Sequence, residues 1–381
     1  MARVAAVPRP RVVLLRGHNA NVWDARPWES LADAYDVELL VTGSNLHETG
    51  SSGVRIVAVR TPRDALPGGR AAGAAAYAIG ERYLGLEPKL AGATIVHAAE
   101  IGTWFSAQAA KLKARLGFRL VVTVWETLPW RDAYRWPRER AYRRAVLPAA
   151  DLFLAATERA REGLLLEGVP AERIEVAEPG ADLSRFSPAA TAPPHHTVLS
   201  PGRLVWEKGH QDVLRALAAV RGGLVGEPRG DVHGLIVGSG PEEAKLKRYA
   251  DELGLGGAVE FRATVPYDQM PSLYAGASAL ALASLPTQAW EEQFGMVLAE
   301  AMASGLPIVA CSTGAIPEVL GGQGTLVPAG DWMGIARALA AGPLAGEPGA
   351  RTSYDAERLR HYSSEAAAER LRGAYARLLA S

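Results

Sequence analysis

Two acidic residues flank the start of a predicted helix in the segment 292–307, EQFGMVLAEAMASGLP. Gly295 opens an apolar helical run, so the free N–H groups of residues 296–298 form a helix N-terminus that suits an anion such as phosphate. Glu300 lies about one and a half turns inside this helix and Glu292 precedes it, so both carboxylates can accept hydroxyl donors beside that anion. A sugar joined through phosphates to a ribose carries such hydroxyls. A capped helix with an ordinary exposed Glu300 explains the same spacing, and both interpretations stay open.

Two cations, Arg203 and Lys208, stand five residues apart at a predicted turn between a strand and a helix. Their side chains can converge on one diphosphate, the guanidinium as a planar fork and the ammonium as a point charge. In the alternative interpretation, one cation pairs with Glu207 and the other is solvated, as is usual for surface charges. The pair therefore predicts an anion site without proving one.

Glycines that follow predicted strands are a weaker signal. Gly238 and Gly240 follow the apolar residues 235–237 and precede a helix, and Gly17 follows the first predicted strand. Glycine at such a turn lets the backbone approach a ligand, but positive φ or close packing also requires it. A ligand-binding role and a packing role are both open for these glycines.

Polar side chains also end two strands predicted in the first half of the chain. His97 and Glu100 follow one strand, and Glu126 follows another. Because ligands bind beyond the carboxyl ends of parallel strands, these side chains are candidates for contact with a bound sugar or acceptor. For Glu126, an ordinary strand-end carboxylate is an equal alternative, and for His97 a packed structural role is favoured over that of a general base.

Between Trp130 and Arg144 lie six arginines interleaved with four aromatic residues. Such a segment can dock on an anionic membrane surface, such as the inner face of a cell membrane, or on an anionic acceptor. Asp132 and Glu139 offset part of the charge, and an arginine-rich helix face is often simply solvated. Peripheral membrane contact is one of two open interpretations of this segment.

Strands and helices alternate along the chain and must position these residues. In the first half, β-rich runs occur at residues 11–16, 37–41, 54–59, 94–97 and 120–124. After the Pro/Ala/Thr-rich segment 187–197, strands are expected at 198–200, 234–237, 259–261, 279–283 and 307–310, and helices at 210–220, 242–253, 271–275 and 296–304. This α/β rhythm predicts two doubly wound, Rossmann-like domains, residues 1–190 and 191–360, with a C-terminal helix in 361–381 crossing back. The active site is expected in a cleft between them.

The composition suits two globular domains and argues against several classes of protein. The 381 residues are 48% hydrophobic and 22% charged, which leaves room for two cores. Basic and acidic residues number 41 each, so no net charge favours binding to nucleic acid. The single cysteine fits a reducing compartment. No apolar run reaches about 18 residues and no signal peptide is recognised, so a cytoplasmic location is expected.

The motifs together resemble the retaining glycosyltransferases of family 4, which have the GT-B fold. The family's E-x7-E element appears as Glu292 to Glu300, its Gly-Arg…Glu-Lys-Gly segment as residues 202–209, and its Gly-x-Gly-Pro turn as residues 238–241. Residues 178–186 and 314–318 are further similar stretches. The resemblance covers most of residues 150–380, whereas in the first half it is mainly architectural.

The resemblance implies a transferase that moves a hexosyl unit from a UDP- or GDP-sugar to a hydroxyl of a carbohydrate, lipid or small-molecule acceptor. It assigns Arg203 and Lys208 to the leaving diphosphate, Glu292 to the donor sugar and Glu300 to the ribose. It places the donor on the second domain and the acceptor on the first. The further donor contacts that it implies are Gly17, Gly238, Gly240, Val265, Gln293, Phe294, Gly295, Met296 and Val297.

Two departures bear on the mechanism. The chain has no Asp-x-Asp pair, so protein groups are expected to neutralise the diphosphate without a metal or other cofactor. Many relatives place a histidine where this chain has Trp125-Glu126. Two alternatives therefore remain: a GT-B nucleotide-sugar epimerase, which would form product without an acceptor, and a catalytically silent nucleotide-sugar binding protein.

Overall fold

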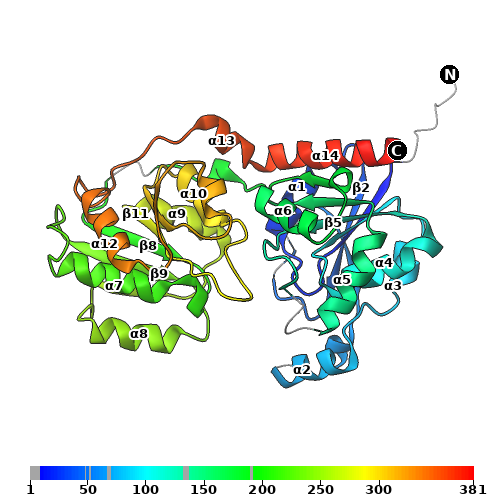
Figure 1. The fold of residues 1–381 in the computed structure, drawn as a ribbon, viewed down its shortest axis with the longest axis horizontal. Helices are drawn as coiled ribbons and strands as arrows, with labels where there is room; N and C mark the ends of the chain where they lie inside the picture. Colours follow the sequence, from blue (N-terminus) through cyan, green and yellow to red (C-terminus); the bar gives the residue numbers. More distant parts are fainter. Residues whose placement is uncertain (1–8, 48, 51–52, 67–69, 132–136, 189–191) are drawn as a thin grey trace. The chain divides into compact units, whose positions relative to one another are not determined.

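The computed structural model divides into two compact units. Unit 1 consists of Met1–Gly180 and Ser364–Ser381, and unit 2 of Ala181–Ser363. The structure describes residues 9–47, 49–50, 53–66, 70–131, 137–188 and 192–381, and all statements below concern these residues. Figure 1 traces the strands and helices of each unit.

Unit 1 is built on a seven-stranded sheet in the order β3-β2-β1-β4-β5-β6-β7, in which all paired strands run parallel. Chain order reverses between β1 and β4, so the loops after these two strands flank the switch point where ligands bind in such sheets. The strands are β1 Arg11–Leu15, β2 Asp36–Thr42, β3 Arg55–Val59, β4 Ile95–Ala99, β5 Arg119–Val124, β6 Leu152–Ala155 and β7 Ile174–Val176.

Helices cover both faces of this sheet. Alternate side chains of β1 enter two different cores, Val13 and Leu15 on one face and Val12 and Leu14 on the other. The second core includes the C-terminal helix α14, which lies beside α1 in Figure 1. The helices are α1 Val22–Glu29, α2 Arg70–Ile79, α3 Leu86–Leu90, α4 Trp104–Leu116, α5 Pro137–Ala149, α6 Glu158–Leu166 and α14 Ser364–Ala380, with short 3-10 turns η1 Pro62–Ala65 and η3 Ala171–Arg173.

Unit 2 repeats this design with a six-stranded parallel sheet in the order β10-β9-β8-β11-β12-β13, which reverses between β8 and β11. Its strands are β8 His196–Pro201, β9 Val232–Val237, β10 Val259–Arg262, β11 Ala279–Leu282, β12 Ile308–Cys311 and β13 Thr325–Val327. Its helices are α7 His210–Arg221, α8 Glu243–Glu252, α9 Met270–Gly276, α10 Met296–Ala303, α11 Ile316–Leu320, α12 Trp332–Ala341 and α13 Ala356–His361, with 3-10 turns η4 Leu183–Arg185, η5 Trp206–Lys208 and η6 Tyr267–Gln269.

The sequence boundary between the units lies earlier than the composition suggests. The Ala181 N–H donates to the Tyr362 carbonyl at 2.9 Å, and the Phe186 ring lies 5.5 Å from the Tyr274 ring. Because these contacts hold residues 181–186 in unit 2, unit 1 ends at Gly180 and not within the Pro/Ala/Thr-rich segment 187–197. Within that segment, residues 189–191 lie outside the described residues.

The two-domain α/β prediction is confirmed, with a parallel sheet in each unit. Each of the ten strands expected from the sequence matches a strand of the structure to within two residues at either end. Among the described residues, no helix has the length and apolar character needed to span a bilayer.

Candidate active site

An ion pair between Lys208 and Glu292 forms the centre of the candidate site in unit 2. Lys208 Nζ lies 2.9 Å from Glu292 Oε1 and 2.8 Å from Oε2, and Ser284 Oγ donates to Oε2 at 2.6 Å. The ammonium also lies 4.8 Å from the centroid of the Trp290 ring, within cation–π range. The two side chains are only 16% and 8% exposed. The structure thus pairs two residues that the resemblance assigns to different parts of the donor.

Close backbone packing holds Lys208 in this place. Turn η5 passes against the end of β11, where the Leu285 N–H donates to the Glu207 carbonyl at 2.8 Å. Gly209, at φ +69, follows Lys208, and a Cβ atom there would lie 1.8 Å from the Ala283 carbonyl oxygen. Only glycine fits this approach, so the local sequence fixes Lys208 beside Ser284.

The backbone of Glu292 is held by the segment that precedes α11. The Ala315 N–H donates to the Glu292 carbonyl at 2.8 Å, and a Cβ atom at Gly314 would lie 2.0 Å from the same oxygen. The sequence places glycine at 314 because this approach leaves no room for a side chain.

Gly295 begins α10 in the left-handed conformation, with φ 81°. The Leu298 N–H donates to the Gly295 carbonyl at 2.8 Å, so the expectation of three free N–H groups at this helix start is wrong for Leu298. Met296 and Val297 stand before it in the first turn and remain the candidates for anion contact. Gln293 is half-buried beside them, and Phe294 is buried with its ring 5.3 Å from the Tyr362 ring.

Glu300 is buried, which rules out the ordinary exposed glutamate of the alternative interpretation. Its side chain accepts a hydrogen bond from the Tyr267 hydroxyl at 2.7 Å on Oε1 and from the Tyr274 hydroxyl at 2.6 Å on Oε2. Burial raises the pKa of Glu300, while these two hydrogen bonds and the nearby Arg185 guanidinium lower it. A ribose can therefore reach this carboxylate only through its remaining lone pairs or in exchange for a tyrosine.

Arg203 and Lys208 do not converge as their spacing predicts. The Arg203 side chain is 64% exposed and lies 4.0 Å from Glu207, whereas the Lys208 ammonium is held by Glu292. An anion that bridges the two cations must therefore compete with Glu292 for Lys208.

His210 supports the Arg203 loop and was missed by the sequence reasoning. Its Nδ1 lies 2.9 Å from Ser200 Oγ, and its Nε2 lies 3.2 Å from the Arg203 carbonyl oxygen. Burial lowers the pKa of His210 to about 4. The neutral ring therefore donates from Nε2 to the Arg203 carbonyl and accepts at Nδ1 from Ser200. A polar residue directly after Lys208-Gly209 at a helix start was the only sequence signal for it.

Gly238 and Gly240 serve the packing of two neighbouring loops. A Cβ atom at Gly238 would lie 1.9 Å from the Gly202 carbonyl oxygen, and one at Gly240 would lie 2.3 Å from the Leu204 carbonyl oxygen. The Leu204 N–H donates to the Ser239 carbonyl across the same contact at 3.0 Å. The packing interpretation therefore accounts for both glycines.

Val265 lies on the next loop, after β10, where it is half-buried. The preceding Thr264 anchors this loop, since its N–H and hydroxyl each lie 3.1 Å from Ser239 Oγ. The structure therefore connects the Val265 loop to the glycine turn, and through it to the Arg203 loop.

Gly17 in unit 1 is also explained by packing. It has φ +60, its N–H donates to the Tyr83 hydroxyl at 2.8 Å, and a Cβ atom there would lie 2.8 Å from the Phe105 ring. The residue stands after β1 at the switch point of unit 1, but its N–H is already bonded within the unit.

His97 is a packed structural residue, as the sequence analysis favours, and the alternative that it contacts a bound sugar or acceptor is wrong. The side chain is fully buried, with Nδ1 2.5 Å from the Tyr375 hydroxyl and Nε2 2.6 Å from Thr123 Oγ1. Burial lowers the pKa of His97 well below its ordinary value, so the ring is neutral. Both nitrogens are used inside the unit, and none is left for a bound sugar.

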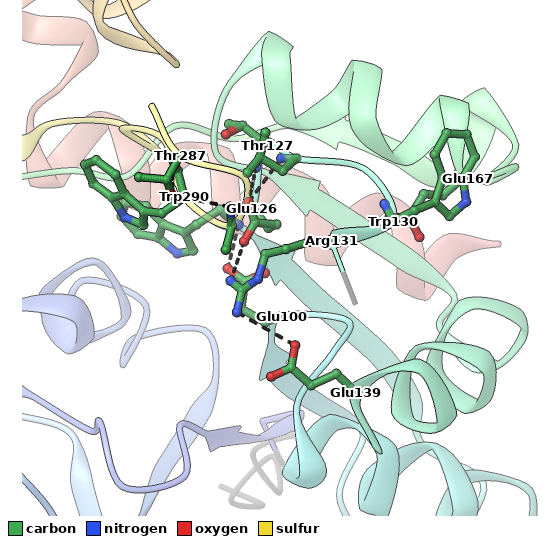
Figure 2. Close-up of polar contacts among 12 residues, drawn as sticks. Glu100, Glu126, Thr127, Trp130, Arg131, Glu139, Glu167, Thr287 and Trp290 are labelled. Atoms are coloured by element: carbon green, nitrogen blue, oxygen red, sulfur yellow. Dashed lines mark hydrogen bonds and ion pairs between the residues drawn. The ribbon is translucent and has the colours of Figure 1, made fainter. Parts of the chain in front are cut away.

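Glu126 organises the loop after β5. Its Oε1 accepts the N–H groups of Thr127 and Leu128 at 3.1 and 3.0 Å, and its Oε2 accepts Arg131 Nη1 at 2.7 Å. Figure 2 shows these contacts, with the second nitrogen of Arg131 turned toward Glu139 at 3.7 Å. The carboxylate therefore has a local structural role whether or not it also touches a ligand.

Glu100, at the end of β4, has a strongly raised pKa. Its Oε1 accepts the Trp125 N–H at 2.9 Å, and its backbone has φ 63°, a conformation that is uncommon outside glycine. Burial raises the pKa of Glu100 to about 7, with a further contribution from the Glu126 charge. This group stands beside the switch point and titrates near neutral pH, a property that spacing alone did not indicate.

The described part of the segment 130–144 binds mostly within unit 1. Arg143 pairs with Glu167 at 2.9 Å, and Arg138 donates to the Ala78 carbonyl at 3.0 Å. The Trp130 N–H donates to the same Glu167, as Figure 2 shows. Residues 132–136, including Arg135, lie outside the described residues. These contacts favour a neutralised helix face over a membrane-docking one.

Two family models match the chain. Residues 195–341 match the model described as glycosyl transferases group 1, and residues 25–180 match a glycosyl transferase 4-like domain. Together the matched segments cover well over half of the chain, and they fall within unit 2 and unit 1 respectively.

Curated relatives are glycosyltransferases. The chain is 32% identical over 215 residues to the D-inositol 3-phosphate glycosyltransferase of Corynebacterium kroppenstedtii, a match that spans 51% of this chain and 46% of the relative. It is 29% identical over 298 residues to D-inositol 3-phosphate glycosyltransferase 1 of Catenulispora acidiphila, spanning 70% of this chain and 67% of the relative. The first of these matches thus covers about half the length of the relative.

Solved structures share the fold over nearly the whole chain. A crystal structure of Anabaena HepE in complex with UDP and glucose has a TM-score of 0.73 at 18% identity, covering 97% of this chain and 100% of that one. Sucrose-phosphate synthase from Thermosynechococcus elongatus has a TM-score of 0.73 at 20% identity, covering 98% and 100%. At these identities the likeness concerns the fold.

Proposed function

Because this chain belongs to the group 1 glycosyl transferases and has the two Rossmann-like domains of the GT-B fold, we propose that it is a retaining, metal-independent hexosyltransferase. The proposed reaction transfers a hexosyl unit from a UDP- or GDP-sugar to an acceptor hydroxyl. Unit 2 binds the donor in this proposal, and unit 1 binds the acceptor.

The observation that carries the proposal is the cluster of Lys208, Glu292 and Ser284 beside the start of α10. A half-buried ammonium, a carboxylate and a helix N-terminus are the groups that a sugar diphosphate needs, since it presents both negative charge and hydroxyl donors. An ion pair that is mostly shielded from solvent gains strength from the low local polarity. The same shielding strengthens the contact of Lys208 with a phosphate.

Donor binding in this proposal exchanges partners within the cluster. The diphosphate takes the Lys208 ammonium from Glu292, and hydroxyls of the donor sugar then donate to the released carboxylate. Each charged group keeps a partner throughout, so the exchange avoids an uncompensated buried charge. Lys208 and the exposed Arg203 then oppose the negative charge that grows on the departing phosphate, where transition-state stabilisation is most effective.

The acceptor class is a matter for experiment. Relatives are named for D-inositol 3-phosphate, which makes that polyol phosphate the first member of an acceptor panel. Glucose, a glycerolipid headgroup and a simple alcohol complete the panel, because they separate carbohydrate, lipid and small-molecule acceptors.

The test is a two-stage assay on the full chain. A thermal-shift panel of UDP, GDP, ADP and their sugars first identifies the donor base, since a ligand that binds the native state raises its melting temperature. The stabilising donor is then incubated with the acceptor panel, and the anomeric configuration of the product is read by NMR. Acceptor-dependent product with retained configuration supports the proposal. Product without an acceptor indicates an epimerase, and binding without turnover indicates a silent binding protein.

A further inference from the structure

We propose that Tyr267 determines the affinity and ribose selectivity of the donor site by occupying the oxygen of Glu300 that the ribose takes. The inference rests on the proposed function and goes further, because it assigns a role to a residue outside the motifs. Tyr267 lies in the three-residue turn η6, two residues after Val265, which the family resemblance places beside the base.

The two tyrosines that bind Glu300 differ in how freely they can move. Tyr274 lies on α9, is fully buried and packs edge-on against Phe186 at 5.5 Å. Tyr267 is only half-buried, and its ring lies 6.1 Å from Phe186. Tyr274 therefore orients the Glu300 carboxylate permanently, while Tyr267 is the partner that can be displaced.

Glu300 needs this second partner because it is buried. The side chain is 3% exposed, so a carboxylate oxygen without a donor would lose its hydration without compensation. The Arg185 guanidinium lies 5.5 Å from the centroid of the Tyr267 ring and acts on Glu300 through its charge. The Tyr267 hydroxyl, at 2.7 Å from Oε1, thus satisfies an oxygen that would otherwise favour any incoming hydroxyl.

Binding of the ribose exchanges one hydrogen bond to Glu300 for another and does not simply add one. When ribose hydroxyls replace the Tyr267 hydroxyl, one hydrogen bond to the carboxylate is formed and another is broken, so the net contribution of the ribose is reduced. A donor without ribose hydroxyls leaves the Tyr267 hydroxyl on Glu300, so its affinity is only slightly lower. The wild-type site is therefore expected to discriminate weakly between ribonucleotides and dideoxyribonucleotides.

When the hydroxyl of Tyr267 is removed, a ribose that binds Glu300 adds a hydrogen bond without breaking another. In Tyr267→Phe, Glu300 Oε1 lacks this donor until a ribose arrives, so ribonucleotides bind more tightly while dideoxyribonucleotides are little affected. The expected change is an increase of about tenfold in the affinity ratio between the two, which corresponds to one charge-assisted hydrogen bond.

The experiment measures this ratio by isothermal titration calorimetry. UDP, GDP and their 2′,3′-dideoxy counterparts are titrated into the wild type, into Tyr267→Phe and into Tyr267→Leu, which keeps apolar bulk without a hydroxyl. The matched control is Tyr354→Phe, because the Tyr354 hydroxyl donates at 2.8 Å to the Leu306 carbonyl, outside the proposed site. Circular dichroism and melting temperature verify that each variant is folded.

The proposal expects the ratio to rise in both Tyr267 variants and to stay at the wild-type value in Tyr354→Phe. A ratio that stays constant or falls in the folded Tyr267 variants overturns it, because the ribose would then add to Tyr267 or bind elsewhere. Failure of the proposed function gives a different result: neither nucleotide binds the wild type, and this inference falls with it.

Discussion

The carboxylates of the two units are satisfied in opposite ways. In unit 2, Glu292 is held by an ammonium and a hydroxyl, and Glu300 by two tyrosine hydroxyls. In unit 1, Glu100 and Glu126 repel each other at the ends of β4 and β5, and the Arg131 charge acts on both. Burial raises the pKa of Glu100 to about 7, and the Glu126 charge adds to this rise.

The two similar sheets therefore carry two different kinds of polar site. In unit 2 every charge of the cluster has a partner, so a ligand must exchange with an existing contact. In unit 1 Glu100 is shielded from solvent beside a second carboxylate, so its charge changes near neutral pH. Specific donor recognition is expected from the first arrangement and pH sensitivity from the second.

The largest expected effect comes from breaking the unit 2 pair at Lys208. Lys208→Met should lower the transfer rate by about 100-fold or more, because a preorganised charge that stabilises the departing phosphate is lost. The double variant Lys208→Met/Glu292→Gln removes both charges, so its melting temperature shows how much of any instability in Lys208→Met comes from an unpaired Glu292 carboxylate. Initial rates under saturating donor provide the measurement.

The control is Lys245→Met, which removes an exposed ion pair with Glu242. The control should transfer at the wild-type rate. Wild-type rates in both Lys208 variants as well would contradict the placement of the diphosphate beside Lys208.

A smaller effect should follow from filling the close approach between the loops of unit 2. Gly238→Ala places a Cβ atom 1.9 Å from a backbone oxygen, so a loss of about 3 kcal/mol in unfolding free energy is expected. The control Gly276→Ala has no neighbouring atom within 4 Å of its new Cβ and should change stability little. Urea unfolding measures both. If the two variants are equally stable, loop packing does not require glycine at position 238, and the ligand-binding interpretation of Gly238 is favoured.

A somewhat smaller loss of unfolding free energy is expected from the buried hydrogen bonds among Trp28, Tyr375 and His97 in unit 1. Tyr375→Phe removes a hydroxyl that accepts from Trp28 Nε1 at 2.9 Å and binds His97 Nδ1, so we expect a loss of about 2 kcal/mol. Tyr35→Phe is the matched control, since its ring packs edge-on against Tyr375 at 5.4 Å and its volume is nearly unchanged. If urea unfolding gives the same stability for both variants, the network does not fix α14.

The Glu100 carboxyl should add a pH dependence of about 1 kcal/mol, after allowance for its partial exposure. Its pKa is about 7 in the folded chain against an ordinary 4.5, so the folded state holds the proton more tightly. Stability from this group is complete below pH 4.5 and is lost as the pH rises through 7. Glu100→Gln should remove that loss, so the unfolding free energy of the variant should rise relative to that of the wild type between pH 5 and pH 8.

Urea unfolding at these two pH values measures the difference, with Glu260→Gln on the surface of unit 2 as the control. If the difference in unfolding free energy between Glu100→Gln and the wild type is the same at both pH values, Glu100 does not titrate in this range.

The smallest expected effect is that of removing divalent metal. If Lys208 and Arg203 neutralise the diphosphate, transfer in excess EDTA should match transfer in magnesium. A loss of activity that magnesium restores would show that protein charges alone do not suffice.

The sequence predicts the fold well because its alternation is regular. The predicted strand 198–200 is part of β8, and the predicted helix 210–220 is α7 to within one residue. Strands β6, β7 and β13 are missed, since each is only three or four residues long and a short apolar run carries no periodicity. Boundaries near Ala181 are missed because tertiary contacts set them.

The site is predicted in its residues but not in its pairing. Motif spacing identifies Lys208 and Glu292, which are 84 positions apart, without indicating that they bind each other. The tyrosine partners of Glu300 stand outside any motif, so only the fold brings them to it. The packed structural role that the sequence favours for His97 is confirmed, since the side chain is buried and both ring nitrogens are bonded within unit 1.

In the proposed function, a bound sugar diphosphate separates Lys208 from Glu292. A crystal structure with the nucleotide sugar that gives the largest thermal shift tests it through one distance, between Lys208 Nζ and the Glu292 carboxylate. We expect this distance to exceed 4 Å, with Nζ on a phosphate oxygen and the carboxylate on sugar hydroxyls. A bound nucleotide beside a pair still at 2.8 to 2.9 Å would contradict it.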